Sequence, residues 1–463
     1  MGKIYIFGIG GTGARVIKSL SLLLASGVTI DADEVVPVFI DPDDAAADLT
    51  RTVHILRTYN AIRERLNTRV PNGFFRTKIT EFVPNFRLPL RNTRDMKFKE
   101  YMGVNRLSDA NKALVHMLFS EDNLESSMQI GFKGNPNIGS VVLNQFADSP
   151  EFISFANSFQ EGDRIFIISS IFGGTGASGF PLLLKTLRGG RQHANWGLIS
   201  KAPIGAISVL PYFRVKPDPE SSIDSATFIS KTKSALAYYD RTISGTNSVD
   251  TLYYIADGDN GKAYDNCEGG AGQQNRAHFI ELASALAIID FVKTPASERT
   301  IHKEFGIEED VHRITFRALG RQSRDLLQRP LTRFLLFAKY LNERHFDTYL
   351  AQPWAKSRKL DASFWKAGFV DDIRAVQADY IQWLDEMSGN ERRFAPFETN
   401  KEKDIYEMLQ GEGLPKRTRF NDYVLFDDRL NKQKRRKDAT REQSFTELFQ
   451  AATDDLITDK YNF

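Results

Sequence analysis

Short apolar runs alternate with amphipathic stretches through the first two thirds of the chain. Five of these runs have the length and the apolar content of buried strands, and they cover residues 3–7, 35–40, 164–171, 204–210 and 251–256. Apolar side chains at helical spacing follow the first run, on one face that comprises Val16, Ile17, Leu20, Leu23 and Leu24. This repeated order of strand and helix predicts an α/β fold with a mainly parallel sheet between helices.

Two further patterns predict how the helices are distributed. Residues 279–291 are almost wholly apolar, which indicates a long central helix buried inside a large protein. Residues 50–130 combine charged helical stretches with prolines and aromatics, and we expect them to form mostly a helical insertion. From residue 319 onward, charged and aromatic side chains alternate at helical spacing. We therefore expect an α/β domain at 1–292 and a helix-rich C-terminal region at 293–463.

Composition indicates which kinds of partner and which cellular compartment to expect. The 463 residues contain 61 Lys and Arg against 59 Asp and Glu, so the overall charge indicates neither a nucleic-acid partner nor an anionic membrane. The basic run 432–437 has no interleaved aromatics and is typical of a solvated helix face. Cys267 is the single cysteine, which excludes a disulfide framework and fits a reducing compartment. We expect a cytoplasmic protein with no membrane span.

Two glycine-rich segments each lie between a strand and a helix, and both predict contact with phosphate. The first is GIGGTG at 8–13, and the second is FGGTGASGFP at 172–181, where Pro181 fits the first turn of the next helix. Free amide groups and the positive end of a helix favour an anion at such a turn. Neither segment continues into the Gly-Lys-Ser/Thr of a Walker A loop. Backbone amides, helix ends and a metal ion would therefore have to meet the phosphate charge.

The first segment alone permits three interpretations. It has the GxGxxG spacing of a dinucleotide-binding loop, and Asp41 lies near the end of the second strand, where such folds carry an acidic residue. An NAD-binding protein and a tight turn without a ligand are therefore both alternatives. The second segment favours a triphosphate, because a dinucleotide fold does not need another glycine-rich turn of this kind.

The loops of this chain resemble those of the tubulin/FtsZ superfamily, in the manner of a divergent bacterial member. The matches run in the order of the family, from GIGGTG at 8–13 through IDPDDA at 40–45 and GNPNIG at 134–139 to the signature loop at 172–181. PYF at 211–213 and TLYYIADGD at 251–259 follow. The resemblance implies a protein that binds GTP, or another purine nucleoside triphosphate, associates with itself into filaments and hydrolyses the nucleotide at the contact between subunits.

The resemblance also implies a set of nucleotide-binding residues. These are Gly8, Gly10, Gly11, Thr12, Gly13, Asp41, Asp43, Gly134, Asn135, Gly173, Gly174, Thr175, Gly176, Ala177, Pro211, Asp257 and Glu281. No side chain is expected to bind a metal directly. Mg²⁺ would be held by the triphosphate and water, with Asp41 or Asp43 in the outer shell. The alternative is that these carboxylates cap a helix, as Asp44 could also do.

Several positions depart from the family pattern and leave alternatives open. Phe172 replaces a small residue, and Asp257 stands where the family has an asparagine that contacts the base. Glu281 resembles a second base contact, and its alternative is a solvated carboxylate at a helix N-terminus. The candidate catalytic residues Glu308, Glu309 and Asp310 lack the Asn-x-Asp pattern of the family and also fit a charged surface turn.

Three functions remain open at the level of the sequence. The first is a filament-forming protein with GTPase activity. The second is a nucleotide sensor that does not polymerise and that presents its helical C-terminal region to a partner protein. The region after residue 319 has mainly helical patterns where the family has a small sheet domain, so either that domain is replaced or the patterns miss short strands. The third is an NAD-dependent oxidoreductase.

Overall fold

The computed structural model describes most of the chain. The described residues are 2–67, 73–93, 96–128, 131–132, 134–190, 194–217, 225–244, 246–258, 263–264, 269–273, 275–299, 305–308, 311–344, 346–399, 405–412, 415–416, 422–461 and 463. Of the predicted residues, Glu309 and Asp310 lie outside these ranges, as does Cys267. Within them, no helix is both long enough and apolar enough to cross a membrane.

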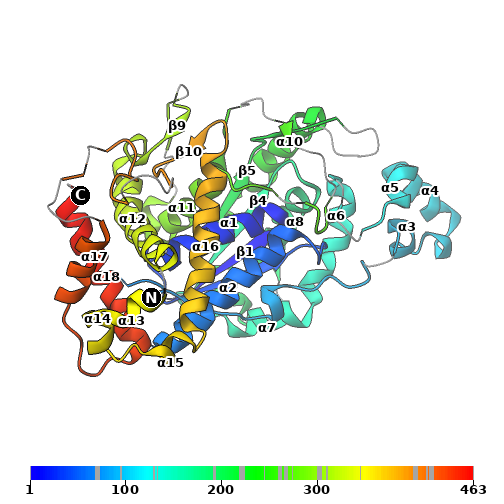
Figure 1. The fold of residues 1–463 in the computed structure, drawn as a ribbon. Helices are drawn as coiled ribbons and strands as arrows, with labels where there is room; N and C mark the ends of the chain where they lie inside the picture. Colours follow the sequence, from blue (N-terminus) through cyan, green and yellow to red (C-terminus); the bar gives the residue numbers. More distant parts are fainter. Residues whose placement is uncertain are drawn as a thin grey trace.

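A parallel sheet of six strands forms the centre of the described structure (Figure 1). Its order is β3-β2-β1-β4-β5-β7, and its strands are β1 (Ile4–Ile9), β2 (Glu34–Ile40), β3 (Lys78–Ile79), β4 (Arg164–Ser170), β5 (Ile204–Val209) and β7 (Thr251–Ile255). Helices cover both faces, which explains why the central strands are nearly continuous apolar runs. The predicted α/β class and the five predicted strands are confirmed. The two-residue strand β3 was missed, because so short a segment has no periodicity.

The order of the strands creates a crevice between β1 and β4. From β1 the chain crosses to β2 on one side, whereas from β4 it crosses to β5 on the other. Because such connections are right-handed, the helices that follow, α1 (Gly10–Ala25) and α8 (Gly174–Gly189), leave toward opposite faces of the sheet. Their N-termini therefore flank the carboxyl ends of two adjacent strands. Ligands of open α/β sheets bind at this kind of switch point.

Both helices begin inside the glycine-rich segments, which corrects the predicted boundaries. Helix α1 starts at Gly10 and not after Thr12, and α8 starts at Gly174, so that Pro181 lies inside the helix. Glycine disfavours a helix interior, but in the first turn it removes side-chain bulk near the free amides. The glycines therefore form the helix ends themselves.

Helices from distant parts of the chain pack around α1. They are α2 (Ala47–Leu66), α11 (Phe279–Lys293), α12 (Arg321–Glu343) and α16 (Phe369–Ser388). On α8, the neighbours include α6 (Pro136–Leu143) and α9 (Trp196–Ile199). The central helix predicted at 279–291 is α11. Its apolar residues are buried on almost every side, as the sequence indicated.

The C-terminal region is rich in helices, as predicted. Most of these helices lie at one end of the molecule, whereas α16 runs past the middle beside α1 and α2 (Figure 1). Besides α12 and α16 it contains α13 (Phe346–Ala351), α14 (Pro353–Ser357), α15 (Ala362–Trp365), α17 (Asp422–Lys432) and α18 (Arg441–Lys460). Aromatic rings fill its core, for example Phe337 and Phe449, whose centroids lie 4.5 Å apart. One short parallel pair joins the segment before α12 to the segment after α16, and it consists of β9 (Arg313–Ile314) and β10 (Arg393–Phe394).

The stretch 50–130 has two parts with different surroundings. Most of α2 lies in its first part and packs against α1, and β3 extends the sheet. The second part holds α3 (Phe98–Tyr101), α4 (Asp109–Leu118) and α5 (Glu121–Glu125), which lie at the end of the molecule opposite the C-terminus (Figure 1). Only this second part has the character of an insertion. The division of the chain at residue 292 stays a prediction.

The remaining elements connect these layers. They are α7 (Pro150–Ser158), α10 (Ser225–Tyr239), the pair β6 (Arg214–Val215) and β8 (Ala263–Tyr264), a π-helical turn at Asp240–Ser244, and 3₁₀ helices at Pro84–Phe86, Val104–Arg106, Asn144–Asp148, Ala296–Glu298 and Phe316–Ala318.

Strand β1 and helix α1 touch through their backbones, and this contact generates a prediction. A Cβ atom on Gly13 would lie 2.3 Å from the carbonyl carbon of Gly8, whereas the nearest atom to a Cβ on Gly11 is an Arg15 nitrogen at 3.7 Å. We expect Gly13→Ala to lower the free energy of unfolding by about 3 kcal/mol, because strand and helix must separate. Gly11→Ala should change it by less than about 1 kcal/mol. Urea denaturation of the two variants measures the difference, and equal stabilities would contradict the assigned contact.

Candidate functional site

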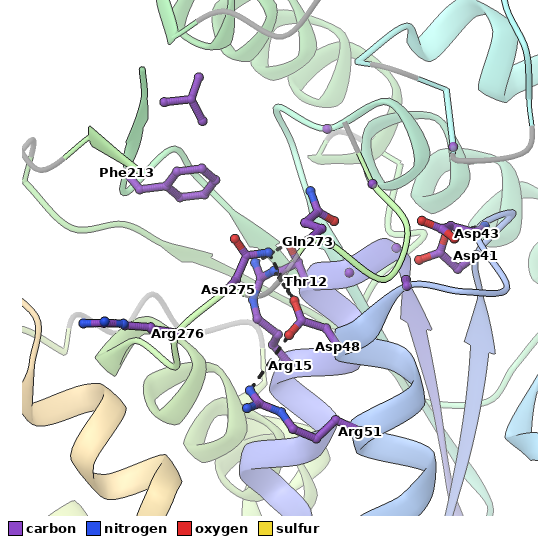
Figure 2. A pocket seen from close by; sticks show the side chains of 18 of the residues that line it. Thr12, Arg15, Asp41, Asp43, Asp48, Arg51, Phe213, Gln273, Asn275 and Arg276 are labelled. Carbon is purple, nitrogen blue, oxygen red and sulfur yellow. Dashed lines mark hydrogen bonds and ion pairs between the residues drawn. The ribbon is translucent and has the colours of Figure 1, made fainter. Parts of the chain in front are cut away.

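A cavity of about 1310 Å³ opens at the carboxyl ends of β1 and β4 (Figure 2). Its walls come from the first turns of α1 and α8, the loop after β2, the loop before α6, the segment before α11, and α2, α12 and α16. Segments separated by several hundred residues therefore form one site. The crevice predicted from the strand order is this cavity.

The two helix N-termini form one end of the cavity, which we call the phosphate end. Gly10, Gly11 and Thr12 line it from α1, and Gly173, Gly174 and Thr175 line it from the start of α8. Neither helix has a side-chain cap, and neither has an acidic residue in its first turn. The unpaired amides and the positive helix ends are thus not compensated by a carboxylate of the same turn. This arrangement favours the binding of an anion at each of the two helix N-termini.

The glycines at this end allow a close approach of backbone segments. Gly10 has a φ angle of +68°, a conformation that residues with a side chain rarely adopt. A Cβ atom on Gly174 would lie 3.0 Å from the amide nitrogen of Asn135 and 3.2 Å from that of Gly134. The loop before α6 therefore packs against the first turn of α8. From the sequence, only the family resemblance predicted that the loop before α6 lies beside the two glycine-rich loops.

The acidic loop after β2 is held by its own backbone. The amide of Asp43 donates to Asp41 Oδ1 at 3.1 Å, and Asp43 in turn accepts from the amides of Ala45 at 3.0 Å and Gly270 at 2.6 Å. Burial raises the pKa of Asp41 to about 7, and the charges of Asp43 and Asp48 add to this effect, although the hydrogen bond from the Asp43 amide opposes it.

Asp44 does not cap α2, contrary to the alternative considered from the sequence. It forms an ion pair with Arg87, and the residue at the N-cap position is Ala46. Asp41 and Asp43 both line the phosphate end. Across the described ranges, no group of three or more His, Cys, Asp or Glu side chains could hold a metal ion.

A buried cation lies one helical turn beyond the phosphate end. Arg15 donates through Nε to Glu281 at 2.8 Å, through one terminal nitrogen to Asp48 at 3.1 Å, and through the other to the Tyr212 hydroxyl at 3.1 Å. Asn275 also donates to Asp48, at 3.2 Å (Figure 2). The guanidinium is therefore engaged on every side by protein groups.

A second set of contacts connects this cation to the C-terminal region. Arg51 on α2 lies 3.9 Å from Asp48 and donates to Glu386 on α16 at 2.9 Å. Glu386 also accepts from the Ala277 amide at 2.8 Å, and the Lys18 ammonium lies 3.8 Å from it. Burial by itself would raise the pKa of Glu386, but Lys18 and Arg51 together bring it below its usual value. We call the six side chains Arg15, Lys18, Arg51, Asp48, Glu281 and Glu386 the ionic network.

The structure places the predicted nucleotide-binding residues in two groups. One group lines the cavity and comprises Gly10, Gly11, Thr12, Asp41, Asp43, Gly134, Gly173, Gly174 and Thr175. The other is absent from the described lining and comprises Gly8, Gly13, Asn135, Gly176, Ala177, Pro211, Asp257 and Glu281. In the second group, Gly8 and Gly13 form the backbone contact between β1 and α1, and Gly176 packs against Ser170 of β4.

The two predicted base contacts are engaged elsewhere. The side chain of Asp257 is buried, forms an ion pair with Arg392 at 2.7 Å, and lies 3.9 Å from His278. Burial lowers the pKa of that histidine to about 4. Glu281 is 1% exposed, so the alternative of a solvated carboxylate is wrong. Glu308 accepts a hydrogen bond from Arg392 through its backbone carbonyl and does not line the described cavity.

The sequence reasoning missed several lining residues. Arg15, Asp48 and Arg51 were not singled out, although Arg15 follows Thr12 by one turn and Asp48 and Arg51 share a helix face. The segment before α11 contributes Gln273 and Asn275 (Figure 2), and its glycines at 269, 270 and 272 were a signal that could have been used.

Phe172, a departure from the family pattern, belongs to an aromatic wall of the cavity. Its ring lies 5.8 Å from that of Phe213 and 5.1 Å from that of Phe228. The wall faces the same cavity as the glycines of the phosphate end.

Comparisons with known proteins were made at three levels. Neither the protein-family models nor the curated proteins contain a match. Among solved structures, the chain is similar to CetZ2 from Haloferax volcanii, a GTPγS-bound protofilament, with 15% identity and a TM-score of 0.31 over 65% of this chain and 60% of that one. It is also similar to the GDP-bound CetZ1 monomer of the same organism, with 14% identity and a TM-score of 0.30 over 55% and 51% of the two chains.

An FtsZ dimer from M. jannaschii gives 16% identity and a TM-score of 0.29 over 66% of this chain and 58% of that one. The matches thus span about half to three fifths of the length of these proteins. They are tubulin-like proteins, of the superfamily that the loop motifs resemble.

The raised pKa of Asp41 predicts a pH-dependent stability. Between about pH 4 and 7 the folded chain retains a proton that the unfolded chain has released, so stability falls as the pH rises, and the full cost is present above pH 7. Asp41→Asn removes this cost. We expect it to stabilise the ligand-free protein at pH 8 by up to about 4 kcal/mol and to have little effect at pH 4.

Thermal denaturation of parent and variant across this pH range measures the effect. Asp44→Asn is the matched control, because it removes the ion pair with Arg87 and should destabilise the protein at pH 8. A difference between parent and Asp41→Asn that does not change with pH would contradict the prediction.

Proposed function

We propose that this protein binds a purine nucleoside triphosphate, GTP, together with Mg²⁺. The observation that carries the proposal is the meeting of two uncapped helix N-termini, from adjacent strands, in one cavity. The triphosphate would lie across Gly10, Gly11 and Thr12 on α1 and Gly173, Gly174 and Thr175 at α8. Amide groups and helix dipoles supply its binding energy, as expected where the Walker lysine is absent.

The metal would be bound chiefly by the phosphate oxygens. Asp41 and Asp43 line the phosphate end and would contact Mg²⁺ through water. When bound, the ion would offset part of the phosphate charge. We propose guanine as the base on the resemblance of the loop motifs to the tubulin/FtsZ superfamily, and adenine is the alternative that the titration tests.

An NAD-binding protein is the competing interpretation of the same fold, since the strand order of the sheet also occurs in dinucleotide-binding proteins. The second glycine-rich helix N-terminus favours the triphosphate. Titration with both ligands separates the two interpretations.

The open space at Gly11 gives a direct test of the phosphate end. We expect Gly11→Asp to place a carboxylate among the phosphate-binding amides without a steric clash, because a Cβ at this position has no neighbour closer than 3.7 Å. GTP affinity in the presence of Mg²⁺ should fall by about a hundredfold or more, through repulsion between like charges at close range. Fluorescence titration with GTP, ATP and NAD measures the change.

Two controls isolate the charge in this experiment. Gly11→Asn has nearly the same shape and should retain most of the affinity, whereas Gly197→Asp adds the same charge at an exposed position away from the cavity. Equal GTP affinity in Gly11→Asp and the parent, or NAD binding in preference to both triphosphates, would refute the proposal.

The family resemblance further implies self-association with hydrolysis completed between subunits. In that case, phosphate release per molecule should rise with protein concentration, and light scattering should increase on addition of GTP. The predicted catalytic residues Glu308, Glu309 and Asp310 would then act on the nucleotide of a neighbouring subunit. Gly11→Asp serves as the inactive control.

A nucleotide sensor is the second candidate, and the contact of Glu386 with Arg51 favours it. Through this contact the helical C-terminal region is part of the wall of the site and could present its state to a partner protein. Tight GTP binding together with flat scattering and a turnover independent of concentration would select the sensor and contradict the filament.

A further inference from the structure

The cavity extends beyond the phosphate end to a wall formed by the C-terminal region. Its volume of about 1310 Å³ exceeds the roughly 300–1,000 Å³ of most small-molecule sites. The N-termini of α1 and α8 form one end, and residues of α16 with Asn342 of α12 form another part of the wall. A triphosphate fixed at the helix N-termini leaves the nucleoside to occupy the rest of the cavity.

One stripe of α16 faces the cavity. It consists of Ala378, Ile381, Gln382 and Asp385, which line the wall and whose spacing places them on one side of a helix. Ala378 and Ile381 are apolar, while Gln382 and Asp385 carry hydrogen-bonding groups. A purine base has apolar faces and a polar edge, and this stripe offers a surface for both.

Glu386 fixes the position of this stripe relative to the phosphate end. This carboxylate accepts from Arg51 of α2 at 2.9 Å and from the Ala277 amide at 2.8 Å, and Gln382 donates to it at 2.8 Å. Helix α2 in turn packs on α1, whose first turn lines the phosphate end. The distance between the two ends is therefore set by the packing of three helices.

Recognition of guanine requires an acceptor for its N1–H and N2–H groups, and most carboxylates of the described lining are already engaged. Asp48 accepts from Arg15 and Asn275, and Glu386 is held by the contacts above. Asp41 and Asp43 accept backbone amides in their own loop, at the phosphate end.

Among the described lining carboxylates away from the phosphate end, Asp385 accepts the fewest hydrogen bonds. Its recorded hydrogen bond comes from the Thr399 hydroxyl to Oδ1 at 3.1 Å, whereas a carboxylate offers about four acceptor positions. Arg276, which is exposed and lines the same cavity (Figure 2), supplies a donor. The aromatic wall, with Phe172, Phe213 and Phe228, offers stacking surface but no carboxylate.

We propose that Asp385 and Arg276 read two edges of a guanine base, with Asp385 accepting from N1–H and N2–H on the Watson–Crick edge and Arg276 donating to O6 and N7 on the neighbouring edge. Arginine forms this pair of hydrogen bonds with guanine in nucleic-acid recognition as well. The inference rests on the proposed function, and it assigns base specificity to the C-terminal region and not to Asp257 or Glu281.

The test compares three ligands on the full chain by calorimetric titration with Mg²⁺. GTP and ITP differ only in the N2 amino group, and tripolyphosphate has no base. The parent should prefer GTP to ITP. Asp385→Ala should lose about tenfold or more in GTP affinity and lose the preference over ITP, while its tripolyphosphate affinity stays that of the parent. Asp371→Ala, an exposed carboxylate of the same helix, should retain all three affinities.

Arg276→Gln gives an independent result, because GTP and ITP share O6 and N7. The variant should lower the affinities for GTP and ITP by a similar factor, so that the ratio of the two affinities stays that of the parent. An unchanged GTP preference in Asp385→Ala overturns the inference, and so does a parent that binds tripolyphosphate but does not distinguish GTP from ITP. A parent that binds neither GTP nor tripolyphosphate overturns the proposed function, and the inference with it.

Discussion

The salt bridges of Arg15 hold the parts of this protein in one arrangement. Its guanidinium lies between Asp48 of α2 and Glu281 of α11, and Arg51 continues the ionic network to Glu386 of α16. Three cations and three carboxylates balance each other in a largely buried space. Removing one partner would leave an uncompensated buried charge, which costs about 3–5 kcal/mol in comparable cases. The network therefore specifies how four helices from distant parts of the chain meet.

Helix α1 is constrained at its start and along its middle, and the candidate site is a consequence. At its start, the contact between Gly8 and Gly13 brings the backbone of β1 against the helix. Further along, Arg15 and Lys18 attach it to its neighbours, and Trp383 of α16 donates to Ser19 at 3.0 Å. The first amides of α1 thus have a fixed direction into the cavity. An uncapped helix end is unfavourable for stability, and its retention at two adjacent strands fits a role in binding an anion.

The sequence predicted the elements better than it predicted their partners. Strands, glycine-rich loops and the apolar helix α11 follow from local patterns, because periodicity and backbone freedom are local properties. The starts of α1 and α8 were placed too late, since glycine is a poor helix former by propensity. Asp257 and Glu281 were assigned to a base from their order along the chain. In the structure their side chains pair with Arg392 and Arg15, which lie 135 and 266 residues away, and no local pattern reports such a pairing. Their contact with a base stays a prediction.

The use of cations in the ionic network also determines how an anion can be bound. Arg15 and Lys18 are the basic residues that follow the first glycine loop on α1, and both face carboxylates. Burial lowers the pKa of Lys18, and Glu281 counteracts this effect, so this ammonium serves the interior of the protein. A phosphate at the helix ends must then be stabilised by amides, dipoles and a divalent cation. Because the same network includes Glu386, a ligand that moves α1 or α2 also changes the contacts of α16. The C-terminal helices are therefore part of the site.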